Sequence, residues 1–220
     1  MDSNQLWAAI DDQRRRTADL LATLTDDQWD HPSLCEGWTV RHVAAHLTLQ
    51  QERVGDALLF MARHPSLLRS PTMNRVIHGS AVLQAKLPTD EIIRRIRSMI
   101  GSRRHNAFLS DREPLIDILV HGQDIAVPLR LELAMPVDAT AEAATRVWRI
   151  RNTWLGSVNR KLPLDGHRLS ATDTDWSVGD GIEVRGPIGA LLLLVTGRPA
   201  ALAQLSGEGA EALKRGALAA

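Results

Sequence analysis

The sequence predicts an α+β protein, with an N-terminal helical bundle over residues 1–160 and a small C-terminal α/β domain over residues 161–220. Up to about residue 160, apolar residues recur three and four positions apart, which is typical of amphipathic helices. Beyond that point, glycine and proline separate segments that are too short for helices and that fit strands. We therefore expect strands only in the second part of the chain.

The first expected helix covers residues 3–24. Its apolar positions follow the helical spacing, and Asp11 and Asp12 each precede an arginine by four residues. Opposite charges four residues apart are neighbours on a helix surface. The arginine run 14–16 is therefore interpreted as a solvated helix face and not as a nucleic-acid patch.

The second expected helix follows a loop that contains Pro32 and Gly37. Thr39 is a good N-cap residue for this helix. The helix is expected to continue toward His64, because the proline that follows His64 disfavours a helical conformation there.

Four more helices are expected in the bundle, over residues 72–86, 90–104, 111–127 and 139–158. Pro88 and Thr89 separate the first two. Ser110 and Glu113 have the spacing of a capping box at the start of the third, and Pro128 ends it.

Short segments dominate the C-terminal domain. Strands are expected over residues 168–171 and 182–185, with 202–205 as a further candidate strand. Helices are expected over residues 187–195 and 208–218.

Composition excludes several functions. The 26 basic residues balance the 26 acidic ones, so we expect neither nucleic acid nor an anionic membrane as a partner. No apolar run approaches the roughly 20 residues of a membrane span, and the N-terminus lacks the pattern of a secretory signal, so a cytoplasmic location is expected. The single cysteine, Cys35, can neither form an internal disulfide nor supply a thiolate cage for zinc.

Two pairs of residues with metal-binding side chains have helical spacing. Asp117 and His121 lie four residues apart on one expected helix, and His42 and His46 do so on another. Such residues share a helix face, so two helices of a bundle can bring two imidazoles and a carboxylate together. Three such ligands suit zinc or another divalent metal and leave a coordination position open, as in catalytic sites. His46 is the favoured third ligand, because it lies deeper in the apolar part of its helix than His42.

The spacing alone also fits a plainer interpretation, in which these histidines are surface residues or satisfied core residues. Asp124 could orient His121 or form an ordinary ion pair. Cys35 could be a reactive thiol near a helix N-terminus, but a small packed residue is the favoured interpretation. Arg198 is a candidate for holding an anionic substrate group, because a guanidinium can bind a carboxylate in a bidentate manner.

Four segments carry a resemblance to a known family: residues 35–47 (CEGWTVRHVAAHL), residues 117–124 (DILVHGQD), residues 172–176 (TDTDW) and Gly197-Arg198. In this order they resemble the mycothiol-dependent maleylpyruvate isomerase family. The resemblance implies a DinB-like four-helix bundle that holds a divalent metal, with zinc expected, followed by a small α/β domain. It also implies that His46, Asp117 and His121 are the metal ligands. Asp117 is one methylene shorter than the glutamate of the isomerases themselves, so metal position and substrate can both differ.

The resemblance further implies an enzyme that uses a low-molecular-weight thiol, mycothiol, which binds at the open metal position and is deprotonated there. An isomerase of the maleylpyruvate type would add the thiolate to a cis-enedioyl double bond, allow rotation and release the thiolate, whereas an S-transferase needs only the addition. Arg198 is the expected catalytic and cofactor-binding contact. The alternatives are a non-catalytic protein that binds a metal or a small molecule, and a metal-dependent hydrolase. Metal affinity is expected to fall as the pH drops through the histidine range near about 6.5.

Overall fold

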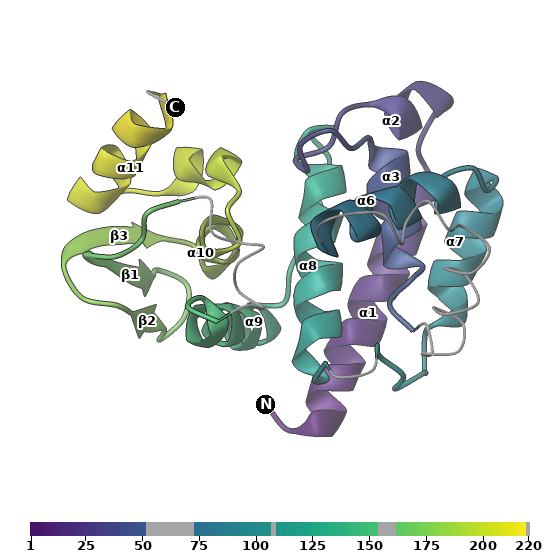
Figure 1. Cartoon of the computed structure of the whole chain (residues 1–220). Coiled ribbons are helices and arrows are strands. Elements are labelled where there is room, and N and C mark those ends of the chain that lie inside the picture. Colours follow the sequence, from purple (N-terminus) through teal and green to yellow (C-terminus); the bar gives the residue numbers. More distant parts are fainter. Residues whose placement is uncertain (52–72, 107–108, 154–161, 219–220) are drawn as a thin grey trace. The chain divides into compact units, whose positions relative to one another are not determined.

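Among the residues that the structure describes, strands are confined to the last part of the chain, as the sequence predicts, and helices precede them (Figure 1). The computed structural model describes residues 1–51, 73–106, 109–153 and 162–218. The chain forms two compact units, Asp2–Ala134 and Met135–Ala220, the latter together with Met1. None of the helices in the described ranges is long and apolar enough to cross a membrane.

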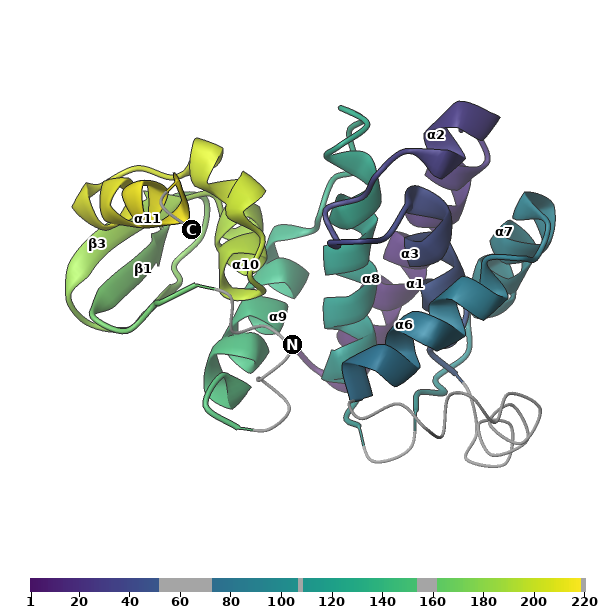
Figure 2. The ribbon, with the colours of Figure 1, turned by 45° about the horizontal axis from the view of Figure 1, so that its top comes forward.

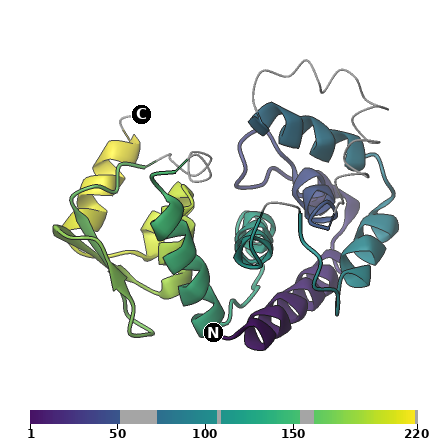
Figure 3. The same ribbon diagram turned by 60° about the horizontal axis from the view of Figure 1, so that its bottom comes forward.

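The N-terminal unit is built from helices. They are α1 (Ser3–Leu21), α2 (Asp26–Asp30), α3 (Val40–Leu47), α6 (Met73–Gln84), α7 (Thr89–Ser98) and α8 (Arg112–Ala126). Helix α1 packs against α7 and α8, and α3 packs against α6, α7 and α8. Figure 3 views α3 and α8 nearly end-on. Trp29, Leu47 and Ile118 belong to one apolar core in this unit, which holds α3 and α8 side by side.

Helix α3 ends earlier than the sequence predicts. It closes at Leu47, where the hydroxyl of Thr48 donates to the carbonyl of Ala45 at 2.7 Å. A side chain that bonds to the preceding turn competes with continuation of the helix. The rest of the expected helix, from residue 52 onward, lies outside the described residues.

Helix α2 is absent from the sequence prediction. Thr25 and Gln28 form a capping box around its first turn, and the helix places Trp29 in the core with 2% of its surface exposed. Its five residues are too few for a periodic apolar pattern, so the capping spacing was the only local signal.

The interpretation of arginines 14–16 as a solvated face is wrong for Arg14, which is fully buried. Its Nη1 donates to the carbonyl of Met99 at 2.9 Å and to that of Ser102 at 3.3 Å. Arg14 therefore ties α1 to the chain that follows α7. The other two arginines of the run pair with Asp12 at the surface.

The C-terminal unit combines helices with a small mixed sheet. Its elements are α9 (Val137–Ile150), β1 (His167–Ala171), β2 (Ser177–Val178), β3 (Ile182–Gly186), α10 (Ile188–Val195), the 3-10 helix η2 (Pro199–Gln204) and α11 (Glu208–Leu218). The strand order is β2-β1-β3, with β1 antiparallel to β2 and parallel to β3. Figure 2 shows α10 and α11 beside this sheet, and both helices contact β3.

The candidate strand over residues 202–205 is wrong. This segment lies mostly in η2, which begins at Pro199. Proline favours the first turn of a helix, because its φ angle is already helical and its missing N–H costs nothing there. The segment is also short, so its apolar composition did not distinguish a strand from a helical turn.

The two units meet in sequence at Ala134–Met135, which differs from the boundary expected near residue 160. Helix α9 accounts for the difference, because it packs against α10. The indole Nε1 of Trp176 also donates to the hydroxyl of Thr145 on α9 at 2.9 Å. Helical spacing predicts α9 itself but carries no information about the unit that covers its apolar face.

Candidate metal centre

Helices α3 and α8 bring the three expected ligands together. His46 lies on α3, Asp117 and His121 lie on α8, and their donor atoms are all within 4.8 Å of one another. Asp117 Oδ2 lies 3.7 Å from His46 Nε2, and Asp117 Oδ1 lies 3.5 Å from His121 Nε2. The two imidazole rings meet edge to face, with centroids 4.9 Å apart.

The local sequence explains why these side chains converge. Leu47 beside His46, and Ile118 beside Asp117, are fully buried, so core packing fixes the rotation of both helices. The four-residue spacing then places Asp117 and His121 on the same face of α8, one turn apart. Packing of α3 against α8 brings His46 opposite that face.

The spacing of the donors fits a divalent metal. Bonds of about 2.0–2.2 Å in a tetrahedral arrangement place donor atoms roughly 3.3–3.6 Å apart. The separations of 3.5 and 3.7 Å between the carboxylate oxygens and the two Nε2 atoms are close to this range. They are also longer than ordinary hydrogen bonds, so the three groups face a common point without being bonded to one another.

Burial and neighbouring groups act differently on the two histidines. Burial lowers the pKa of His46 to about 4, so its imidazole is neutral and offers a lone pair at neutral pH. Burial also acts to lower the pKa of His121, but hydrogen bonds to Asp124 and Cys35 outweigh it and raise that pKa to about 10. Without a metal, His121 therefore holds a proton that a bound cation must displace.

The carboxylate of Asp117 is the most open of the three groups. Its side chain is 37% exposed, whereas those of His46 and His121 are 16% and 15% exposed. Gln50, just beyond the end of α3, donates from Nε2 to Asp117 Oδ2 at 3.3 Å. The sequence does not predict this role of Gln50. The expected helix continues through Gln50, and a continuous helix gives no reason for its side chain to turn toward α8.

An aromatic side chain borders the cluster next to His46. The ring of Trp38 meets that of His46 edge to face at a centroid distance of 5.4 Å. The indole Nε1 of Trp38 donates to Nδ1 of His78 on α6. The sequence motif that carries the family resemblance contains Trp38, but spacing assigned it no role.

A second group of polar side chains lies on the opposite edge of the His121 ring. Asp124 is fully buried, and its Oδ2 lies 2.8 Å from His121 Nδ1. The Cys35 thiol donates to the same oxygen at 3.0 Å and lies 3.8 Å from His121 Nδ1. Asp124 thus pairs with His121 and is also placed to orient it. Cys35 is partly buried, and besides packing it takes part in this hydrogen-bonded group.

His42 has a different environment from His46. Its Nδ1 accepts from the backbone N–H of Thr39 at 3.1 Å, as the side chain at the third helical position of a capping box does. Burial lowers the pKa of His42, and electrostatic interactions with His78 and Arg41 act in the same direction. The residue caps α3 and contributes no atom to the cluster.

Arg198 lies in the C-terminal unit, at the start of η2. Its Nη1 donates to the backbone carbonyl of Thr196, and its side chain is partly buried. The role of Arg198 in binding an anionic group stays a prediction.

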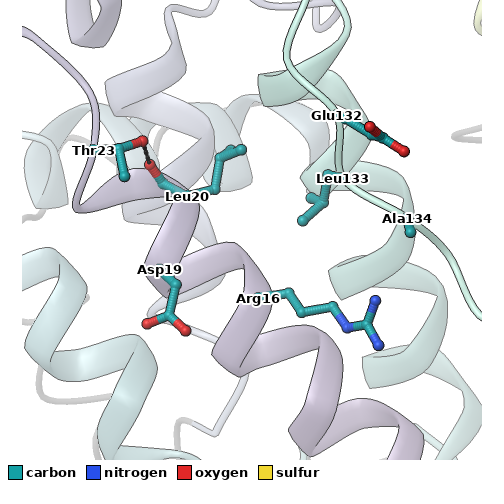
Figure 4. A pocket seen from close by; sticks show the side chains of 7 residues that line it. All are labelled: Arg16, Asp19, Leu20, Thr23, Glu132, Leu133 and Ala134. Carbon is teal, nitrogen blue, oxygen red and sulfur yellow. Dashed lines mark hydrogen bonds between the residues drawn. The ribbon is translucent and has the colours of Figure 1, made fainter.

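A separate pocket lies on the N-terminal unit (Figure 4). Its volume is about 520 Å³, and it is lined by Arg16, Asp19, Leu20, Thr23, Glu132, Leu133 and Ala134. The lining holds both acidic and basic side chains but shares no residue with the His46, Asp117 and His121 cluster. We therefore place the candidate site at the cluster.

Comparison with known proteins agrees with this fold. The mycothiol maleylpyruvate isomerase N-terminal domain model matches residues 10–126, which is more than half of the chain. A crystal structure of mycothiol-dependent maleylpyruvate isomerase is 13% identical, with a TM-score of 0.60 and coverage of 96% of this chain and 94% of that chain. A crystal structure of a mutant of mycothiol-dependent maleylpyruvate isomerase is 12% identical, with the same TM-score and coverage. No curated protein matches the chain.

The likeness to the solved structures shows a shared fold, and the described helices and small sheet of this chain place it in the α+β class. The matched segment is more specific, because it includes His46, Asp117 and His121 together. The chain belongs to the mycothiol maleylpyruvate isomerase N-terminal domain family.

Proposed function

We propose that this protein is a metal-dependent isomerase that uses mycothiol as its thiol cosubstrate, with His46, Asp117 and His121 holding the metal. The observation that carries the proposal is the convergence of two imidazole Nε2 atoms and one carboxylate between α3 and α8. Zinc is the proposed metal, since two nitrogen ligands and one oxygen ligand with an open fourth position are typical of catalytic zinc. We also propose that the helices form a DinB-like bundle, whose facing helices suit such a site.

The residues of the cluster have distinct tasks in this proposal. His46 is neutral and provides a lone pair, while Asp117 balances part of the charge of the cation and is steered by Gln50. A divalent cation at this position favours the thiolate form of a bound thiol and so provides a nucleophile at neutral pH. Trp38 packs edge to face against the ring of His46.

The proposed reaction is a cis–trans isomerisation of an enedioyl acid. The thiolate adds to one carbon of the double bond, and the substrate rotates about the resulting single bond. Loss of the same thiolate restores the double bond in the trans arrangement and regenerates the nucleophile. No atom is gained or lost, so no further reactant is required. If the adduct instead took up a proton from water at the neighbouring carbon and were released as a thioether, the protein would be an S-transferase.

Two further residues bear on the substrate. Arg198 is proposed to hold an anionic group, because a planar guanidinium binds a carboxylate through two parallel hydrogen bonds. Asp117 is shorter than a glutamate, so the proposed substrate class is cis-enedioyl acids in general and not maleylpyruvate alone. A cytoplasmic location is proposed as well, since the cytosol keeps a thiol cosubstrate reduced.

The test combines metal analysis with turnover. Purified protein is analysed for bound metal and then incubated with maleylpyruvate and other cis-enedioyl acids, with and without mycothiol. We expect about one zinc per chain and isomerisation that requires the thiol. Turnover without thiol would indicate the hydrolase alternative, accumulation of a thioether adduct would indicate a transferase, and metal binding without turnover would indicate a binding protein. Loss of the visible spectral response of the cobalt-substituted protein to mycothiol in His46→Ala, but not in His42→Ala, would assign the thiol to this centre.

A further inference from the structure

A fully buried carboxylate, that of Asp124, contacts the edge of the His121 ring that faces away from Asp117. Asp124 is 0% exposed, and it lies three residues after His121 on α8, with Oδ2 2.8 Å from His121 Nδ1. A buried carboxylate is stable only when it is well paired and hydrogen-bonded. The pairing with His121 therefore satisfies Asp124, and it also constrains the His121 ring.

A second donor reaches the same oxygen from another part of the chain. The thiol of Cys35 lies 3.0 Å from Asp124 Oδ2. The backbone holds this thiol in place, because the N–H of Leu34 donates to the carbonyl of Asp124 at 3.1 Å. Within the loop, the Ser33 hydroxyl accepts from the N–H of Cys35 at 3.1 Å. The loop before α3 is thus anchored on the end of α8.

The hydrogen bonds determine where the protons lie. The Cys35 thiol donates to Asp124 Oδ2, and a carboxylate oxygen that accepts from one donor can accept from His121 Nδ1 as well. A neutral imidazole with its hydrogen on Nδ1 presents a lone pair at Nε2, and this atom is the one that faces Asp117. His46 has no corresponding support, because its buried Nδ1 has no partner among the described residues.

We propose that Asp124 is a positioning residue that fixes the orientation and tautomer of His121 for metal binding, and that the Cys35 thiol supports it as a hydrogen-bond donor. This inference rests on the proposed metal site. It makes His121 the anchored ligand and His46 the adjustable one. It also gives the Cys35 sulfur a hydrogen-bonding task toward Asp124.

The test measures zinc affinity by chelator competition on folded, metal-free protein. Partners that orient a metal-bound histidine typically contribute about 10–100-fold to metal affinity, so Asp124→Asn should weaken zinc binding by this factor. Cys35→Ala should weaken it in the same direction, and Cys35→Ser should restore it, because a hydroxyl still donates to Asp124. The control is Asp19→Asn, which removes an exposed carboxylate paired with Arg97 and should leave the affinity unchanged.

A spectroscopic measurement separates positioning from a general structural effect. Nitrogen-15 NMR of the zinc-loaded protein should show His121 with its hydrogen on Nδ1, and Asp124→Asn should change that signal while His46 keeps its own. If Asp124→Asn does not fold, the Cys35→Ala and Cys35→Ser pair decides the question with the same two measurements. Unchanged affinity and an unchanged His121 signal in the Asp124 or Cys35→Ala variant would overturn the inference. If His46→Ala also retains parental zinc affinity, the proposed metal site itself is wrong.

Discussion

His42 and His46 form a matched pair for testing the metal centre. Both are histidines on α3, one helical turn apart, so replacing either by alanine changes helix propensity equally. Their surroundings differ, because His42 Nδ1 accepts from the N–H of Thr39 whereas His46 Nε2 faces Asp117. We expect His42→Ala to reduce stability without affecting metal binding, and His46→Ala to abolish metal binding.

The expected magnitudes follow from these contacts. Loss of a capping interaction costs about 0.5–2 kcal/mol, and each kcal/mol lowers the Tm of a chain of this size by roughly 2–4 °C. Zinc at 100 times its Kd stabilises the folded state by about 2.7 kcal/mol. The parent protein and His42→Ala should therefore both gain about 5–10 °C on adding zinc, and His46→Ala should gain nothing.

The assay is thermal unfolding with and without zinc, followed by metal analysis after dialysis. The metal-induced shift in Tm is the decisive quantity, because it cancels any change that a substitution makes to the metal-free protein. A shift of parental size in His46→Ala would refute the assignment of His46 as a ligand. Loss of the shift in His42→Ala would show that His42 is the ligand in its place.

Three other changes give further tests. Asp117→Glu should retain zinc and raise activity on maleylpyruvate relative to other cis-enedioyl acids, as measured by kcat/KM on both substrates; lower metal content would contradict this. Zinc affinity should rise about tenfold per pH unit between roughly pH 7 and 9, because zinc displaces the proton that His121 holds with a pKa of about 10. A plateau in zinc affinity above pH 7 would show that His121 titrates in the ordinary range. Arg198→Lys should raise KM although it keeps the positive charge, because the planar guanidinium is lost, and unchanged KM and kcat would remove Arg198 from the site.

The parts of the fold that sequence predicts are those with local causes. Helix α8 follows from its apolar spacing. Of the expected capping box only one half forms, because the N–H of Ser110 donates to the Glu113 carboxylate at 2.8 Å while the N-cap residue of α8 is Asp111. The approach of Asp117 and His121 follows from their four-residue spacing on that helix. Each of these features depends on atoms within one or two helical turns.

The missed features depend on contacts between distant parts of the chain. Arg14 is buried because it meets carbonyl groups 85 and 88 residues away. The thiol of Cys35 reaches a carboxylate 89 residues away. Local patterns of charge and apolarity carry no information about such partners. For this reason, the sequence alone does not reveal that Arg14 is buried or that Cys35 is hydrogen-bonded.

The surroundings of the three proposed ligands divide the site into a fixed side and an open side. On the fixed side, His121 is bonded to a buried carboxylate that is itself tied to the loop before α3. On the open side, Asp117 is the most exposed of the three, and its hydrogen-bond donor Gln50 lies beyond the end of a helix. A metal ligand that is held by rigid neighbours determines how tightly the metal is bound. An exposed ligand next to the open coordination position instead contacts the substrate or cosubstrate that binds there. Substitutions behind His121 should therefore change metal affinity first, and substitutions at Asp117 should change substrate preference first.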